Sequence, residues 1–144
     1  MTMAVRMNIA RFKEGLQAEL GKLQKATRPA AQAGAQIIYE RAKINVPVSK
    51  EAHKFYGTHR VYGPYNPGNL RDSIYQVFSE DKSYKDVSTY HVSFNKDKAP
   101  YGFMVEFGTS RAPAHSFIGK SVVETRGEVR KAIKARYLQE VKGK

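Results

Sequence analysis

Serine, histidine and acidic side chains in the last half of the chain are the first candidates for chemistry. Ser110 or Ser116 could act with His115, and with Asp72 or Glu106, as a nucleophilic triad. In many hydrolases the nucleophile lies in a Gly-x-Ser-x-Gly turn between a strand and a helix, and the sequence contains no such turn. The sequence therefore lacks the element that would position this triad.

Metal and cofactor chemistry has equally little support. The four histidines, at positions 53, 59, 91 and 115, form no His-x-x-x-His pair, and the acidic residues form no cluster. Cysteine is absent, which excludes disulfides, thiolate zinc sites and cysteine nucleophiles. The sequence also lacks a glycine-rich loop of the kind that cradles phosphates. We expect no enzymatic activity, no metal and no cofactor, and we expect His91 to be solvated on a strand's polar face.

Length and composition are typical of one globular domain, residues 1–144. Hydrophobic residues make up 41% of the chain, and its apolar runs are shorter than the roughly 20 residues that span a bilayer. The N-terminus lacks the apolar stretch of a signal peptide, so we expect a soluble, intracellular protein. The net charge of +12 favours an anionic partner. It is concentrated at the two ends, +7 in residues 1–67 and +5 in residues 113–144, while residues 68–112 are neutral.

Two helices are predicted at the N-terminus. Apolar residues recur at spacings of three and four from Val5 to Leu23, which predicts an amphipathic helix. Thr27-Arg28-Pro29 predicts a break and a second helix start, and this second helix should end before Pro47. Small residues at 30–35 would let another backbone approach closely. The two helices would form a helical hairpin.

Residues 49–67 follow no period of 2 or 3.6, and aromatic and basic residues alternate with glycine and proline there. We predict a loop that orders on assembly and buries its tyrosines against a neighbour. Stacking on nucleic acid is the alternative.

A period of 2 predicts an antiparallel hairpin over residues 74–78 and 90–94, with one polar face. Residues 101–107 fit either a strand or a short helix. Apolar residues from Ile118 to Val141 predict a long C-terminal helix with a basic outer face. The predicted fold is therefore α+β: an N-terminal helical hairpin, a small antiparallel sheet and a long C-terminal helix.

The segment 106–111 predicts a corner of the chain. Gly108 can adopt a positive φ, Thr109 or Ser110 can bond the freed backbone, and Glu106 lies close enough in sequence to pair with Arg111. Phe117 should then enter the core at the start of the last helix. These features are typical of a stable turn.

The stretch Tyr101–Ile118 resembles the signature of small head–tail joining proteins of long-tailed bacteriophages, the neck or tail-completion group similar to lambda's minor tail protein Z. The family pattern has a tyrosine, a Glu-x-Gly-Thr corner, Pro-Ala and a phenylalanine that opens the C-terminal helix. A second matching piece is Gly68–Ile74, and a third runs from Ala33 to Pro47. The resemblance favours a short helix over residues 101–107. The segment at about 49–67 is an insertion where this family is short. The residues that carry the two main motifs are Tyr101, Glu106, Gly108, Thr109, Arg111, Pro113, Phe117, Gly68, Leu70, Arg71 and Ser73.

The resemblance implies a structural virion protein, made in the bacterial cytoplasm, that forms a ring of six copies at the head–tail junction. Its partners would be other copies of itself, a head-side connector or head-closure protein, and a tail terminator or tail tube protein, with packaged DNA passing through. We expect the basic helices to face mainly partner proteins. The candidate assembly contacts are Phe12, Leu16, Leu20, Phe55, Tyr56, Tyr62 and Tyr65. The alternative function is that of a small basic nucleic-acid-binding protein, although no known binding motif supports it.

Overall fold

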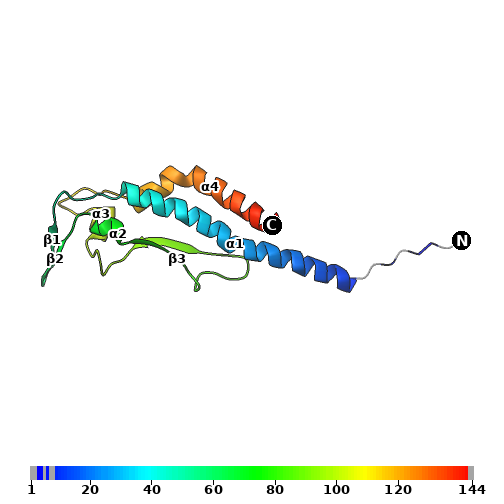
Figure 1. Ribbon diagram of the computed structural model, residues 1–144. Coiled ribbons are helices and arrows are strands. Elements are labelled where there is room, and N and C mark those ends of the chain that lie inside the picture. Colours follow the sequence, from blue (N-terminus) through cyan, green and yellow to red (C-terminus); the bar gives the residue numbers. More distant parts are fainter. Residues whose placement is uncertain (1–2, 5, 7–8, 143–144) are drawn as a thin grey trace.

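The computed structural model describes residues 3–4, 6 and 9–142, and it has the predicted α+β architecture (Figure 1). Within these residues, four helices and four strands follow in the order α1 (Ile9–Asn45), β1 (His53–Tyr56), β2 (Val61–Tyr65), α2 (Asn69–Asp72), β3 (Ile74–Phe78), β4 (Tyr90–Phe94), α3 (Gly102–Phe107) and α4 (Ile118–Lys142). The strands form two separate antiparallel pairs, β1–β2 and β3–β4. The expected short helix over residues 101–107 and the long C-terminal helix are both present.

The predicted break at Thr27–Pro29 and the N-terminal helical hairpin that depends on it are both wrong, because α1 continues through Pro29 as one helix of 37 residues. A proline inside a helix costs about 3 kcal/mol through its missing N–H and its clash with the preceding turn. Here Ala26 and Ala30, on either side of it, are both buried, and Thr27 Oγ1 lies 2.7 Å from Ser88 Oγ. Tertiary packing on both sides of the proline therefore keeps the helix continuous. The helix ends at Asn45, before Pro47 as expected, and Val5 lies outside the described residues.

Helix α4 packs along the C-terminal half of α1 and runs antiparallel to it (Figure 1). Gly34 permits this approach, since a Cβ atom at that position would lie 2.8 Å from the Ile133 side chain. The small residues around Gly34 thus admit side chains of α4, Ile133 and Val129, against the surface of α1. The N-terminal part of α1 extends beyond the end of α4 and projects from the rest of the molecule.

The β3–β4 hairpin has the predicted alternation. Ile74 and Phe94 are a cross-strand pair and both are buried, whereas Tyr75 and Val77 are exposed on the other face. His91, opposite Val77, is exposed as expected. Helix α1 contacts both strands, so the sheet has one covered and one open face.

Residues 53–65, expected to be part of a loop, form a second hairpin. Side chains of β1 alternate between half-buried and exposed, but a register irregularity between His53 and Phe55 and the Gly63-Pro64 pair in β2 hide the period in the sequence. The turn closes with the Gly57 N–H donating to the Arg60 carbonyl at 2.9 Å. Residues 53–65 are therefore an ordered hairpin at one end of the molecule (Figure 1).

The hydrophobic core lies where the C-terminal end of α1, the base of β3–β4 and the start of α4 meet. Phe117 is at its centre with no exposed surface, and its ring lies 5.9 Å from that of Phe94. The buried cluster consists of Ala42, Val46, Leu70, Ile74, Phe94, Ala99, Tyr101 and Phe117. The two sequence motifs, Gly68–Ile74 and Tyr101–Ile118, thus both contribute residues to the same core.

Candidate functional site

The carboxylate of Glu106 caps the N-terminus of α4. Its Oε2 accepts hydrogen bonds from the N–H groups of Phe117 at 2.8 Å and Ile118 at 3.0 Å. Its Oε1 accepts from the Gly119 N–H at 3.0 Å and from Ser116 Oγ at 2.8 Å. The first N–H groups of a helix have no partner within the helix, and a negative charge there is favourable. One side chain from α3 therefore satisfies three such donors and fixes where α4 begins.

Burial and hydrogen bonding act on the Glu106 carboxyl in opposite directions. Only 9% of the residue is exposed, and this burial raises its pKa. The backbone donors Gly119, Ile118 and Phe117, together with the Ser116 hydroxyl, lower it by more, so the pKa lies below its ordinary value. The carboxylate is thus held in its charged form by the helix that it caps.

The corner after α3 has the predicted geometry. Gly108 has φ 78° and ψ 175°, a region almost confined to glycine, and a Cβ there would lie 2.7 Å from the Ala114 nitrogen. Thr109 Oγ1 accepts from the N–H groups of Arg111 at 3.2 Å and Ala112 at 3.1 Å. The suggested pairing of Glu106 with Arg111 is wrong, because the carboxylate points to α4. Within the described part of the chain no ion pair joins these two residues, and Arg111 and Pro113 are exposed.

The second motif packs against the first. Asn69, next to Gly68, donates through Nδ2 to the Tyr101 hydroxyl at 3.2 Å and to the Lys98 carbonyl at 2.8 Å. Gly68 has φ 83°, Leu70 is buried, and Ser73 Oγ bonds back to the Leu70 carbonyl at 2.6 Å.

Tyr101 and Gly102 lie at the contact between the two motifs. Burial raises the pKa of the Tyr101 hydroxyl, and the hydrogen bond from Asn69 offsets part of this rise. Gly102 leaves room for Leu70 and Phe94, since a Cβ there would come within 2.8 Å of both side chains. Arg71 is exposed and pairs with its neighbour Asp72 at 3.2 Å. The two motifs therefore build one structural unit.

The candidate Ser–His–acid triad is not assembled: among the described residues, no hydrogen bond joins the His115 ring to a serine or to an acidic side chain. Ser116 Oγ is engaged by Glu106, Asp72 pairs with Arg71, and the His115 backbone N–H donates to the Val105 carbonyl at 2.8 Å. Over residues 3–4, 6 and 9–142, no group of three or more His, Cys, Asp or Glu could hold a metal ion. No helix among the same residues is long and apolar enough to cross a membrane.

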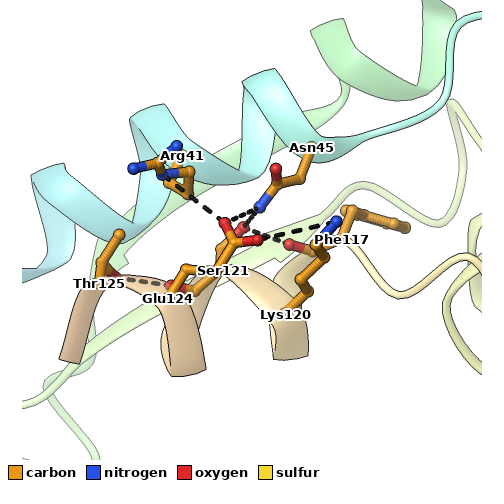
Figure 2. A network of polar contacts seen from close by, with 7 residues as sticks. All are labelled: Arg41, Asn45, Phe117, Lys120, Ser121, Glu124 and Thr125. Atoms are coloured by element: carbon orange, nitrogen blue, oxygen red, sulfur yellow. Dashed lines mark hydrogen bonds and ion pairs between the residues drawn. The ribbon is translucent and has the colours of Figure 1, made fainter.

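A polar network that the sequence did not reveal joins α1 to α4 (Figure 2). Asn45 Nδ2, at the end of α1, donates to Ser121 Oγ and to Glu124 Oε2, both at 3.0 Å. Arg41 Nε and Lys120 Nζ lie 3.8 and 3.7 Å from the same carboxylate. The Asn45 hydrogen bond is the main cause that lowers the pKa of Glu124, and the two cations add to it.

Two buried hydroxyls lie beneath this network. Ser121 Oγ donates to the Phe117 carbonyl, and Thr125 Oγ1 donates to the Ser121 carbonyl at 2.6 Å. Both bonds return to the backbone one turn earlier, and Ser121 Oγ also accepts from Asn45, so both hydroxyls are hydrogen-bonded although they are buried. The sequence did not indicate that Ser121 and Thr125 are buried, because Ser and Thr in a helix usually face solvent.

The candidate assembly contacts fall into two groups. Leu16 and Leu20, in the N-terminal half of α1, are about half exposed, at 53% and 47%, and Tyr56 at the hairpin tip is 74% exposed. The side chain of Phe12 lies outside the described residues. By contrast, Phe55, Tyr62 and Tyr65 are half-buried, with Phe55 against Tyr62 at 5.6 Å and Tyr65 against Tyr101 at 5.0 Å between ring centroids.

Helix α3 adds an exposed aromatic pair that sequence reasoning missed. Phe103 and Phe107 are 60% and 70% exposed, with ring centroids 5.4 Å apart. The two phenylalanines are four residues apart, so they lie on one face of a helix, and this spacing could have identified the pair once a helix was assumed.

Comparison with protein-family models, curated proteins and solved structures finds no match for this chain. The functional assignment therefore depends on the residues and on the surfaces just described.

Proposed function

We propose that this chain is a structural virion protein that forms a ring at the head–tail junction of a long-tailed bacteriophage. The observation that carries the proposal is the Tyr101–Ile118 motif, the most specific part of the resemblance. Its polar groups are used internally: Glu106 caps α4, and Thr109 closes the corner. A motif that shapes the chain instead of presenting reactive groups suits a structural protein, so we propose no enzymatic activity.

The exposed apolar surfaces support the proposal. A ring built from identical subunits with head-to-tail contacts requires two different contact surfaces on each subunit. The N-terminal half of α1 exposes Ile9, Leu16 and Leu20, and the β1–β2 hairpin at the opposite end of the molecule exposes Tyr56 and Val61. Apolar residues gathered on projecting elements are typical of contact surfaces.

The charge distribution is compatible with a path for DNA or with acidic partner rings. Helices α1 and α4 each carry seven Lys or Arg and three Glu, so together they account for +8 of the net +12. Contacts made by such helices would weaken as the salt concentration rises.

An amber stop in this gene alone tests the proposal. Separate DNA-filled heads and unattached tails in the lysate, seen by negative-stain microscopy, are the expected result, with a suppressor host as the control. Intact infectious particles would remove the joining role. Salt-sensitive binding of the purified protein to naked DNA, combined with intact particles, would favour the nucleic-acid-binding alternative.

A further inference from the structure

A groove of about 490 Å³ runs along the outer side of β4. Its floor is the small-residue face of α1, including Ala31, Gly34 and Ala35, and its far wall is the apolar face of α4 with Val122 and Ile133. The near wall is residues 88–92, which include the first half of β4. The groove therefore has an apolar side and a strand side.

The strand side is an open edge. Asn95 N–H donates to the Ser73 carbonyl and Ser79 N–H to the Thr89 carbonyl, at 2.9 and 2.8 Å. In an antiparallel ladder hydrogen-bonded pairs alternate with non-bonded ones, so the bonded pairs within the hairpin are Tyr75–Ser93 and Val77–His91. The N–H and C=O groups of the even-numbered residues of both strands point outward, and no backbone bond to them is present in the described structure.

The outer edge of β3 is open in the same way, and it has one further feature. Gln76 donates through Nε2 to Gln36 Oε1, but its own Oε1 is buried and has no hydrogen-bond partner among the described residues. Buried polar atoms of this kind are rare in complete structures. An unpaired acceptor beside an unpaired strand edge is consistent with a surface that another chain covers.

We propose that the groove beside β4 receives the β3 edge of a second copy of this chain, so that neighbouring hairpins join into a continuous antiparallel sheet. This inference deepens the proposed ring function and depends on it. The hairpin of each copy has two different open edges, one on β3 and one on β4. Pairing β4 with the neighbour's β3 is thus a head-to-tail contact of the kind that closes a ring.

The backbone groups of the two edges favour a second copy as the occupant. The outer edge of β4 and the outer edge of β3 each present N–H and C=O groups that have no backbone partner among the described residues, and antiparallel pairing of the two edges would satisfy both sets. The α4 residues that line the groove are apolar: Ile118, Val122, Val129 and Ile133. The two surfaces are therefore complementary in hydrogen bonding.

Mixed single-cysteine variants test the pairing directly, because the chain contains no cysteine of its own. One sample carries His91→Cys on β4, and the other carries Val77→Cys or Tyr75→Cys on β3. These side chains lie on the open face of the sheet, and residues opposite each other in a non-bonded pair have Cα atoms about 4.5 Å apart, within disulfide range. After oxidation at high protein concentration, we expect a disulfide dimer in a mixture and none in either sample alone.

Three results would overturn the proposal. A dimer of His91→Cys with itself would indicate symmetric β4–β4 pairing. Cross-links from His91→Cys to residues that precede α1 would identify a terminal segment as the occupant. A chain that stays monomeric at millimolar concentration and forms no mixed dimer would show that the groove does not accept a second copy's strand.

A matched pair of α4 variants provides a second test. Val122, 38% exposed, lies in the groove wall, while its neighbour Val123 is 67% exposed and lies outside the groove. We expect Val122→Asp to weaken self-association by about tenfold or more, measured by sedimentation, and Val123→Asp to leave it within about twofold. Equal weakening of self-association by the two variants would contradict the assignment of the groove as the contact surface. If both tests fail while the amber stop still separates heads from tails, the strand pairing is wrong and the joining role stands.

Discussion

Replacing Glu106 by alanine removes the cap of α4, and the structure allows the cost to be worked out. The Phe117 N–H is buried with the rest of that residue, and a buried donor without a partner costs about 1–3 kcal/mol. The N–H groups of Ile118 and Gly119 are closer to solvent and can bond water when the carboxylate is absent. Losing their bonds to Glu106 therefore costs about as much as losing a helix cap, about 1 kcal/mol. We therefore expect Glu106→Ala to lower the free energy of unfolding by about 2–4 kcal/mol.

Urea unfolding monitored by circular dichroism measures this loss. Ser116→Ala is the matched control, because it removes one of the four bonds to the carboxylate and should cost about 1 kcal/mol. A Glu106→Ala protein within about 0.5 kcal/mol of the parent would refute the capping role, since surface changes usually stay within that range.

The same carboxylate predicts a pH dependence. Its folded-state pKa lies below the ordinary value of 4.5, so the unfolded chain binds the proton more readily. Its contribution to stability is complete above that value and is lost as the pH falls through the folded-state pKa. Unfolding of Glu106→Gln should accordingly change less between pH 5 and the acid range than that of the parent. Parallel pH profiles of the two proteins would contradict this reasoning.

Three further predictions concern the corner, the core and the projecting helix. Gly108→Val should impair folding, because a β-branched residue resists the positive φ and its Cβ would meet Ala114; unchanged thermal stability would disprove the corner geometry. Phe117→Ala should cost about 3–5 kcal/mol in urea unfolding, as expected for a fully buried ring, and a loss below 1 kcal/mol would exclude it from the core. Leu16→Ser combined with Leu20→Ser should leave the free energy of unfolding within about 1 kcal/mol of the parent but reduce particle assembly. Normal assembly by this double variant would remove the α1 surface as a contact.

The sequence patterns correctly predicted the features that depend on residues close together in the chain. The period of 2 identified β3 and β4, Pro47 marked the end of α1, and Gly108 marked the corner, because each depends on the residue itself and its neighbours in sequence. The helix stripe of α4 was visible for the same reason.

The features that the sequence did not predict depend on contacts between residues that are distant in the chain or on irregular strand pairing. Pro29 is tolerated because Ala26 and Ala30 are buried against other elements, which no local rule includes. The β1–β2 hairpin was missed because an irregular register and Gly63-Pro64 interrupt its alternation. Glu106 was assigned to a near neighbour in sequence, whereas its partners lie ten to thirteen residues away on α4.

In vitro joining tests the central claim most directly. Purified protein would be added to a lysate of the amber strain that contains separate heads and tails, and plaque-forming particles would then be counted. The proposed role predicts that infectivity rises with the amount of protein added, and that Val122→Asp restores less than Val123→Asp. Heads and tails that remain separate and non-infectious at every concentration of correctly folded protein would contradict it.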